Sequence, residues 1–254
     1  TNEEARALAS IAAKRGGKTA SFGVDPAAES FYTVCSDKLV TSYDEIKAAD
    51  LFVAINCDVF GNPYVQATAI RRAVREGAGY IMADAVTKEV KDAISAAEKP
   101  VVVLGPVFDP DLLPYLAMLD AKVLIPAIRC NSRGVAKYLD VENDLVQSAE
   151  SLIIWGEDPV GYGKGRDILD KTKFTVVCDL FLTETAKLAD VVLPLGSFAE
   201  NSGTFTNVFG ITQEVRQAFE GISNLTTLEE LASALGSAEP REYSCKALVD
   251  RPAY

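Results

Sequence analysis

Short apolar runs alternate with segments of helical periodicity along most of the chain. Each run is apolar at consecutive positions, which is typical of strands buried on both faces of a parallel sheet. The runs are LFVAI (51–55), YIMAD (80–84), VVVLG (101–105), KVLIP (122–126), SLIIWG (151–156), FTVVCD (174–179) and DVVLP (190–194). The alternation of such runs with helical segments predicts an α/β fold with mainly parallel sheets flanked by helices.

Polar and glycine residues mark where several of these elements begin and end. Asn2 is the expected N-cap of a first helix that stops at Gly16. Residues 18–24 (KTASFGV) are predicted to form a short strand. Near the end of the chain, Thr227 and Glu230 are expected to cap a last helix.

The two halves of the chain can be laid over each other. ADLFVAINCDV from Ala49 aligns with AESLIIWGEDP from Ala149 at an offset of 100, and YIMAD aligns with TVVCD at an offset of 95. One interpretation is that the match between the halves reflects only the general likeness of all β-α-β units. The other, favoured by matched acidic residues at strand ends, is two related Rossmann-like lobes. On that interpretation the first lobe spans 1–141, the second spans 142–220, and 221–254 form a C-terminal helix and tail.

Composition excludes several classes of function. The chain has 254 residues, 48% of them hydrophobic, and a net charge of −11, which argues against nucleic-acid binding. No apolar run suggests a membrane span or a signal peptide, so we expect no membrane insertion. There is no histidine, and none of the five cysteines forms a C-x-x-C pair, so we expect no metal or iron–sulphur site within this chain.

The glycine-rich stretch from Gly156 to Gly165 raises the question of a phosphate-binding loop. A P-loop would need lysine where Tyr162 stands, and a Rossmann fingerprint would need its third glycine one residue later than Gly165. Both motifs therefore fail. A helix starting after Gly165 would still offer free amides to an anion, and the alternative is a mobile surface turn.

The segment that follows resembles a known family. DLFLTETAKLADVVLPLGSFAENSGTFTN (179–207) is similar to the signature of the molybdopterin oxidoreductase family. WGEDP (155–159), TNEE (1–4) and CNSRG (130–134) are similar to further segments of it, so that the resemblance spans most of residues 1–215. The matching signature residues are Thr183, Thr185, Ala186, Ala189, Asp190, Pro194, Glu200, Gly203, Thr204 and Asn207.

In that family a molybdenum or tungsten ion is held by pterin guanine dinucleotides between two related α/β domains. The resemblance implies that Gly156, Asp158 and Pro159 lie along the dinucleotide phosphates. It further implies that Asp179 accepts hydrogen bonds from the guanine edge, since a carboxylate can accept two donors.

The remaining cofactor positions come from the same resemblance. Thr183 and Thr185 would support the guanine-binding aspartate, and Asp84 would be its counterpart in the first lobe. Several family features are missing, however. Asn56-Cys57-Asp58-Val59 replaces G-x-N-P in the first lobe, Phe209 and Ile211 replace Glu and Arg, and no candidate metal ligand stands in a recognisable context.

This pattern resembles one branch of the family, the large iron–sulphur subunit of NADH-quinone oxidoreductase, known as its G subunit. The resemblance implies a structural or vestigial cofactor domain that is not catalytic alone. The alternative is the pterin-guanine-dinucleotide-binding part of a molybdenum or tungsten formate dehydrogenase α subunit. A self-standing NAD enzyme is a third hypothesis, which the failed fingerprint disfavours.

Either type of full-length parent protein implies the same cofactors, partners and location. Because Thr1 is not a start methionine, we expect a chain that is processed or cut from a longer one. We expect no cofactor within this chain, molybdopterin guanine dinucleotide in the parent, and iron–sulphur clusters in a preceding region. The expected partners are other subunits of a redox complex, and the expected location is the cytoplasm, either free or peripheral to the inner membrane through that complex.

Overall fold

A computed structural model describes residues 1–21, 26–61, 65–105, 107–127, 129–139, 149–163 and 165–235. The described residues divide into two compact units. Unit 1 contains 1–21, 149–204 and 214–235, and unit 2 contains 26–139 and 205–213. The predicted domain boundaries at 141 and 220 follow the linear sequence, whereas the contacts group the N-terminal helix with the second sheet.

Unit 2 is built on sheet A, whose four strands are all parallel. The strand order is β2-β1-β3-β4, so β1 lies inside the sheet between β2 and β3. The strands are β1 (Leu51–Ile55), β2 (Gly79–Ala83), β3 (Pro100–Leu104) and β4 (Lys122–Leu124). All four were predicted from their apolar runs.

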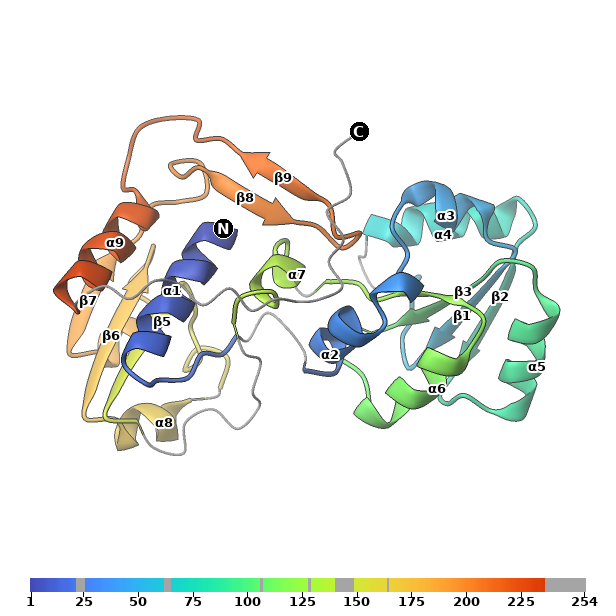
Figure 1. Cartoon of the computed structure of the whole chain (residues 1–254), viewed down its shortest axis with the longest axis horizontal. Coiled ribbons are helices and arrows are strands. Elements are labelled where there is room, and N and C mark those ends of the chain that lie inside the picture. The colour runs from blue at the N-terminus through green and yellow to red at the C-terminus, as the bar shows by residue number, and fades with distance from the viewer. Residues whose placement is uncertain are drawn as a thin grey trace. The chain divides into compact units, whose positions relative to one another are not determined.

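Helices cover both faces of sheet A (Figure 1). Val53 and Ile55 pack into one hydrophobic cluster, with residues of α2, α5 and α6, whereas Phe52 and Ala54 pack into another, with residues of α3 and α4. Successive side chains of β1 thus enter opposite cores, as the continuous apolar run predicts. The helices are α2 (Pro26–Val34), α3 (Tyr43–Ala48), α4 (Val65–Arg75), α5 (Lys88–Ala96), α6 (Leu113–Met118) and α7 (Ser132–Val135), with 3-10 turns η1 (Ser36–Lys38) and η2 (Pro110–Leu112).

Unit 1 is built on sheet B, a three-stranded parallel sheet with the order β5-β6-β7. Ile154 and Val177 pack with Leu169 of α8 in one cluster, and α1 packs against α9. The strands are β5 (Ser151–Trp155), β6 (Phe174–Asp179) and β7 (Val191–Pro194). The helices are α1 (Asn2–Lys14), α8 (Arg166–Lys171) and α9 (Asn224–Ala234), with the 3-10 turn η3 (Ala186–Leu188). The mixed α/β class with mainly parallel sheets is therefore confirmed.

A two-stranded sheet was not predicted. It consists of β8 (Gly203–Thr206) and β9 (Thr212–Val215), which run in opposite directions in Figure 1. Within unit 2, buried side chains hold its turn: Asn131 Oδ1 accepts from the Thr206 amide at 2.7 Å, and Arg133 donates to the Val208 carbonyl at 3.0 Å. The CNSRG and GTFTN segments of the sequence are thus joined by hydrogen bonds.

Two predicted N-caps and one predicted strand differ from the structure. Thr1, not Asn2, caps α1, because its hydroxyl accepts from the Glu4 amide in a capping box. Residues 18–21 form no strand, and 22–24 lie outside the described residues. The last helix is capped by Ser223, earlier than the predicted Thr227.

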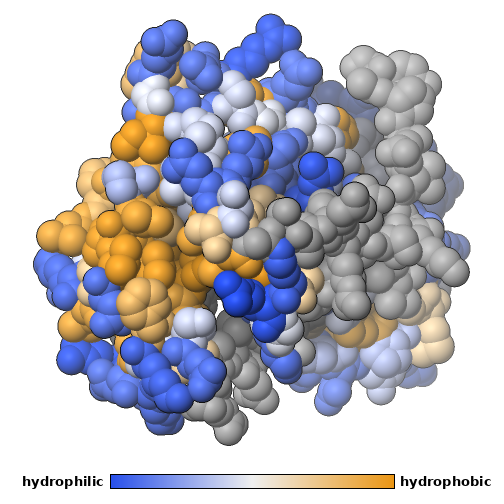
Figure 2. All heavy atoms as spheres, turned by 60° about the vertical axis from the view of Figure 1, so that its left-hand side comes forward, coloured by the Kyte–Doolittle hydropathy of each residue, from blue (hydrophilic) through white to orange (hydrophobic). Residues whose placement is uncertain are grey.

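Unit 1 exposes many large apolar side chains. Figure 2 is turned so that the side of sheet B comes forward, and it shows a broad apolar area there. The exposed apolar residues of this unit include Phe174, Leu180, Phe181, Leu182, Leu188, Val191, Val192, Phe198, Phe219 and Ile222. Apolar areas of this kind mark interaction surfaces more often than free solvent boundaries.

The core of unit 2 makes a direct prediction about stability. Ile70 is fully buried on α4, where it packs with Phe52 of β1 in the same cluster. Ile70→Ala should lower the free energy of unfolding by about 2–5 kcal/mol, because the substitution removes buried methyl groups and leaves a cavity. Urea unfolding would measure the loss. Thr68→Ala, on the exposed side of the same helix, should change stability by less than about 0.5 kcal/mol, and equal effects of the two would contradict the packing.

Candidate functional site

The loops after β1 and β5 have the same backbone geometry, although their sequences differ. The Asn56 amide donates to the Ala83 carbonyl at 2.9 Å, and the Gly156 amide donates to the Cys178 carbonyl at 2.8 Å. These bonds join positions related by the offsets of 100 and 95 found in the sequence. Both residues also have a positive φ, 49° at Asn56 and 61° at Gly156. Asn56 tolerates this conformation better than most non-glycine residues.

An aspartate holds each of these loops closed. Asp58 Oδ1 accepts from the Gly61 amide at 2.8 Å, and Asp158 Oδ1 accepts from the Gly161 amide at 3.1 Å. A Cβ atom at either glycine would overlap the carboxylate, so the loop closes this tightly only with glycine. The two aspartates are therefore equivalent in structure as well as in sequence.

In unit 1 a buried threonine completes the closure. Thr185 is 0% exposed, and its hydroxyl and amide both donate to Asp158 Oδ1, at 2.6 and 2.9 Å. The Thr185 hydroxyl oxygen also accepts from the Val160 amide at 3.0 Å. We call Asp158, Thr185 and the amides of Val160 and Gly161 the loop clasp. It ties the loop after β5 to the segment between β6 and β7.

The loop clasp stabilises the ionised form of its carboxylate. Partial burial raises the pKa of Asp158, but the hydrogen bonds from the side chain and backbone of Thr185 and from the Gly161 amide outweigh burial. The pKa of Asp158 is therefore lowered from its ordinary value. The charge is compensated within the loop itself.

Most described amides of the glycine-rich loop already have acceptors inside the protein. Besides those of Gly156, Val160 and Gly161, the Tyr162 amide donates to the Asp158 carbonyl at 3.1 Å and the Gly163 amide to the Val160 carbonyl at 2.9 Å. A phosphate cradle needs backbone amides that point at the ligand. These five amides point at acceptors within unit 1 instead.

Asp179, at the carboxyl end of β6, differs from the residues of the loop clasp. Its Oδ1 accepts from the Phe181 amide at 3.2 Å, and among the described residues its second oxygen has no hydrogen bond. The side chain is half-buried, and the neighbouring Phe181 side chain is 71% exposed. Carboxyl ends of parallel strands are where open α/β sheets bind ligands. Asp179 thus keeps a free acceptor beside an accessible aromatic ring.

The remaining predicted site residues differ in their contacts and exposure. Thr183 Oγ1 accepts a hydrogen bond at 3.2 Å from the amide of Ala186, the first residue of η3. Pro159 is buried, and Gly156 is exposed. Asp84 is exposed just after β2 in unit 2. Whether any of these residues contacts a cofactor stays a prediction.

Several other signature residues also make hydrogen bonds within the protein, which the sequence alone did not reveal. Glu3 accepts from the amide and hydroxyl of Thr204 at 2.8 and 2.7 Å, and Trp155 donates to Glu4 at 2.9 Å. Asp190 accepts from the Thr175 amide at 2.7 Å. The TNEE segment and the signature therefore stabilise the fold of unit 1 together.

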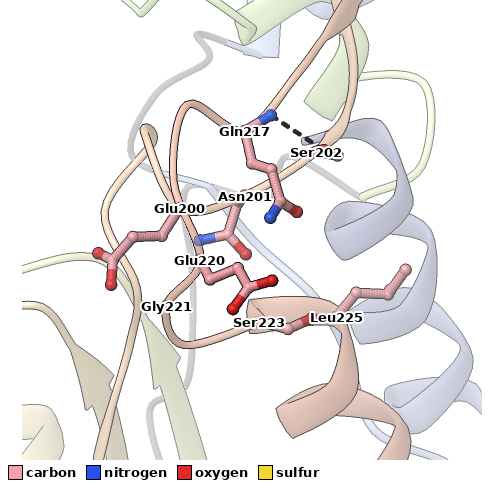
Figure 3. A pocket seen from close by; sticks show the side chains of 8 residues that line it. All are labelled: Glu200, Asn201, Ser202, Gln217, Glu220, Gly221, Ser223 and Leu225. Carbon is pink, nitrogen blue, oxygen red and sulfur yellow. Dashed lines mark hydrogen bonds between the residues drawn. The ribbon is translucent and has the colours of Figure 1, made fainter.

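Glu200 and Asn201 lie at a hollow of about 390 Å³ in unit 1 (Figure 3). Among the described residues, its walls carry two carboxylates, from Glu200 and Glu220, and no lysine or arginine. Glu200 accepts from the Ser197 amide at 2.7 Å, and Asn201 accepts from the Asn224 amide at 2.7 Å. An acidic hollow of this kind does not suit an anionic dinucleotide, and its polar groups hold the loops around it.

Cys57 and Cys178 are shielded thiols at the ends of β1 and β6. Burial raises the pKa of each to about 11, so both are protonated at neutral pH. In the described part of the chain, no cluster of three or more metal-ligating side chains occurs. None of the described helices is long and apolar enough to cross a membrane.

Part of the chain matches a known family model. Residues 156–225 match the family model for molybdopterin oxidoreductase. The matched residues include the whole loop clasp and Asp179.

Similar proteins include subunits of several redox enzymes. The chain is 40% identical over 101 residues to the F420-dependent formate dehydrogenase subunit alpha of Methanocaldococcus jannaschii, which is 37% of this chain and 15% of that subunit. It is 40% identical over 90 residues to a G subunit (G 2) of NADH-quinone oxidoreductase from Rhizobium meliloti, 32% of this chain and 11% of that subunit. It is 32% identical over 121 residues to the assimilatory nitrate reductase catalytic subunit of Bacillus subtilis, 44% of this chain and 17% of that subunit. The chain spans only these small shares of its relatives.

The loop clasp predicts a stability loss on removal of one hydroxyl. Thr185→Val keeps the shape but removes the donor to Asp158 and the acceptor of the Val160 amide. The free energy of unfolding should fall by about 1–3 kcal/mol, because buried polar groups lose their partners. Thermal or urea unfolding measures this. Thr183→Val is the matched control, which loses one turn hydrogen bond and should cost about 1 kcal/mol or less; a larger loss there than at Thr185 would contradict the account.

The lowered pKa of Asp158 predicts how this loss depends on pH. A carboxylate with a lowered pKa in the folded state stabilises the fold above its unfolded pKa, and this contribution disappears as the pH falls through the folded pKa. The difference in unfolding free energy between wild type and Thr185→Val should therefore be largest near pH 7 and shrink between about pH 5 and about pH 2. Urea unfolding across this range measures it. A difference that grows on acidification would show that the ionised carboxylate is not the stabilised form.

Proposed function

We propose that this chain, whose residues 156–225 belong to the molybdopterin oxidoreductase family, is a structural domain of an electron-transfer subunit, of the same type as the G subunit of NADH-quinone oxidoreductase. On this proposal each of its two α/β units keeps a Rossmann-like fold with a loop like those of a pterin dinucleotide site, without the full chemistry of such a site. The chain itself is not catalytic. Its role is structural: it supports the larger redox subunit and provides surfaces for contacts within it.

One observation carries the proposal: amides that a diphosphate would need already donate hydrogen bonds within unit 1, to the loop clasp or to backbone carbonyls. The family resemblance implies that Asp158 would lie along the dinucleotide phosphates, and its carboxylate is ionised at neutral pH. Two anions placed together repel unless a cation or donors intervene. Five of the described amides of the loop are directed to Asp158, Thr185 and backbone carbonyls instead.

The residues present fit a pterin guanine dinucleotide only in part. Asp179 fits the guanine edge, since it has a free carboxylate oxygen next to the exposed Phe181 ring. The loop after β5 does not fit the diphosphate, for the reason just given. The equivalent loop of unit 2 has Asp58 in the same closed geometry. We therefore derive no catalytic step that passes through this cofactor.

The free oxygen of Asp179 favours a second candidate, the pterin-guanine-dinucleotide-binding part of a formate dehydrogenase α subunit. The similarity to a formate dehydrogenase subunit alpha agrees with it. In that case Asp179 binds the guanine, and Gly156, Asp158 and Pro159 rearrange to admit the phosphates. Thr183 and Thr185 then support the aspartate, and Asp84 is its counterpart in unit 2.

The proposal also covers the partner subunits, the iron–sulphur clusters and the location of the parent protein. The names of the relatives describe them as subunits, and we propose that this chain also works beside other subunits of a redox complex. Iron–sulphur clusters would lie in another region of the parent polypeptide. We propose a cytoplasmic location for the complex.

A nucleotide titration separates the two candidates. A ligand that binds only the folded state must raise the unfolding midpoint, by an amount set by its concentration relative to Kd. The structural proposal predicts no shift of the thermal midpoint with GDP at about 1 mM, and no change in the fluorescence of Trp155, the single tryptophan, at the end of β5.

The matched control is Asp179→Asn, which keeps the shape of the side chain but replaces its second acceptor oxygen with a donor. A midpoint increase with GDP in wild type that is lost in Asp179→Asn would reject the structural proposal in favour of the formate dehydrogenase candidate. A shift that persists in Asp179→Asn and also occurs with ADP would reject guanine recognition at this residue as well.

A further inference from the structure

The outer edge of β5 in sheet B has no partner strand among the described residues, whereas its counterpart in sheet A has one. Sheet A continues past β1 to β3 and β4, in the order β2-β1-β3-β4. Sheet B has the order β5-β6-β7, so it ends at β5. Because β5 and β6 correspond to β1 and β2, the position beside β5 corresponds to that of β3.

The hydrogen-bonding direction of the backbone can be assigned residue by residue. The Gly156 amide points to β6, and alternate residues of a strand point to the same side. The backbone groups of Ile154 therefore face β6, and those of Ile153 and Trp155 face the outer edge. By the same rule, Val53 and Ile55 face β3 in sheet A, where both strands are paired in register.

Burial agrees with the position of β5 at an edge of the sheet, in contrast to β1. Phe52, Val53 and Ile55 of β1 are each 0% exposed. The equivalent residues of β5, including Ile153 and Trp155, are only half-buried. A strand inside a parallel sheet is shielded by neighbours on both sides, and a strand at an edge by one alone.

We infer that the outer edge of β5 is a docking edge for one more parallel strand, of apolar sequence like that of β3. The strand comes from polypeptide outside the 254 residues, since the relatives of this chain are several times longer than the part that it matches. The backbone of Ile153 and Trp155 would form the ladder with it. This inference does not depend on whether a pterin cofactor binds.

Amide hydrogen exchange tests the inference on the chain as it exists. In the ¹⁵N-labelled 254-residue chain, the amides of Ile153 and Trp155 should exchange at least about 100-fold faster than those of Val53 and Ile55, because only the latter are held in a ladder. If the amides of Ile153 and Trp155 exchange as slowly as the ladder amides of β1 in a monomeric chain, the chain's own residues already cover the edge and the inference is wrong. If they slow down only as the chain dimerises, the occupant is a second copy, and the inference is also wrong.

A peptide with the sequence of residues 98–105 (EKPVVVLG) serves as the probe for the missing strand. Bound beside β5, it should slow exchange at Ile153 and Trp155, and a version with lysine at the central valine should not. Ile153→Pro removes one outward amide, and proline is tolerated only at strand edges. This variant should fold and lose the protection of Trp155 by the peptide. No protection in wild type at millimolar peptide, or full protection in Ile153→Pro, would overturn the inference.

Discussion

The structure of unit 1 depends on the hydrogen bonds that one carboxylate accepts. Asp158 gathers the hydroxyl and amide of Thr185 and the amide of Gly161, and Thr185 in turn accepts from Val160. Backbone groups in a tight loop after a buried strand need acceptors, and leaving them unpaired is expensive. The loop clasp supplies these acceptors. It fixes the carboxyl end of β5 relative to the segment between β6 and β7, and so fixes the place where a ligand of this fold would bind.

The same principle explains why so many residues of the family signature point inward. Glu3 with Thr204, Asp190 with the Thr175 amide, and Glu200 with the Ser197 amide all satisfy backbone or hydroxyl donors within unit 1. These residues therefore stabilise the fold of unit 1 through their own hydrogen bonds. Asp179 differs from these residues, because one of its carboxylate oxygens has no hydrogen bond among the described residues and the exposed ring of Phe181 lies close to it in the sequence.

The sequence predicts the strands well and the connections between distant residues poorly. The strands of both parallel sheets follow from their apolar runs, and in β1 and β3 these runs correspond to burial on both faces. The repeat predicts equivalent loops, and Asn56 and Gly156 share the same backbone conformation and hydrogen bond. The loop clasp was not predictable, since Thr185 lies 27 positions from Asp158, and Glu3 lies 201 positions from Thr204. The β8–β9 hairpin was missed because its strands are half-exposed and polar, and they depend on Asn131 and Arg133 for anchoring.

Five described amides of the loop after β5 already donate within unit 1, which is why we propose a structural role for this loop instead of cofactor binding. Native mass spectrometry of the parent protein, purified with all its subunits and combined with molybdenum and tungsten analysis, tests this most directly. The account predicts a subunit mass without any pterin dinucleotide and no stoichiometric molybdenum or tungsten. One pterin guanine dinucleotide per chain, lost together with the metal in Asp179→Asn, would contradict it.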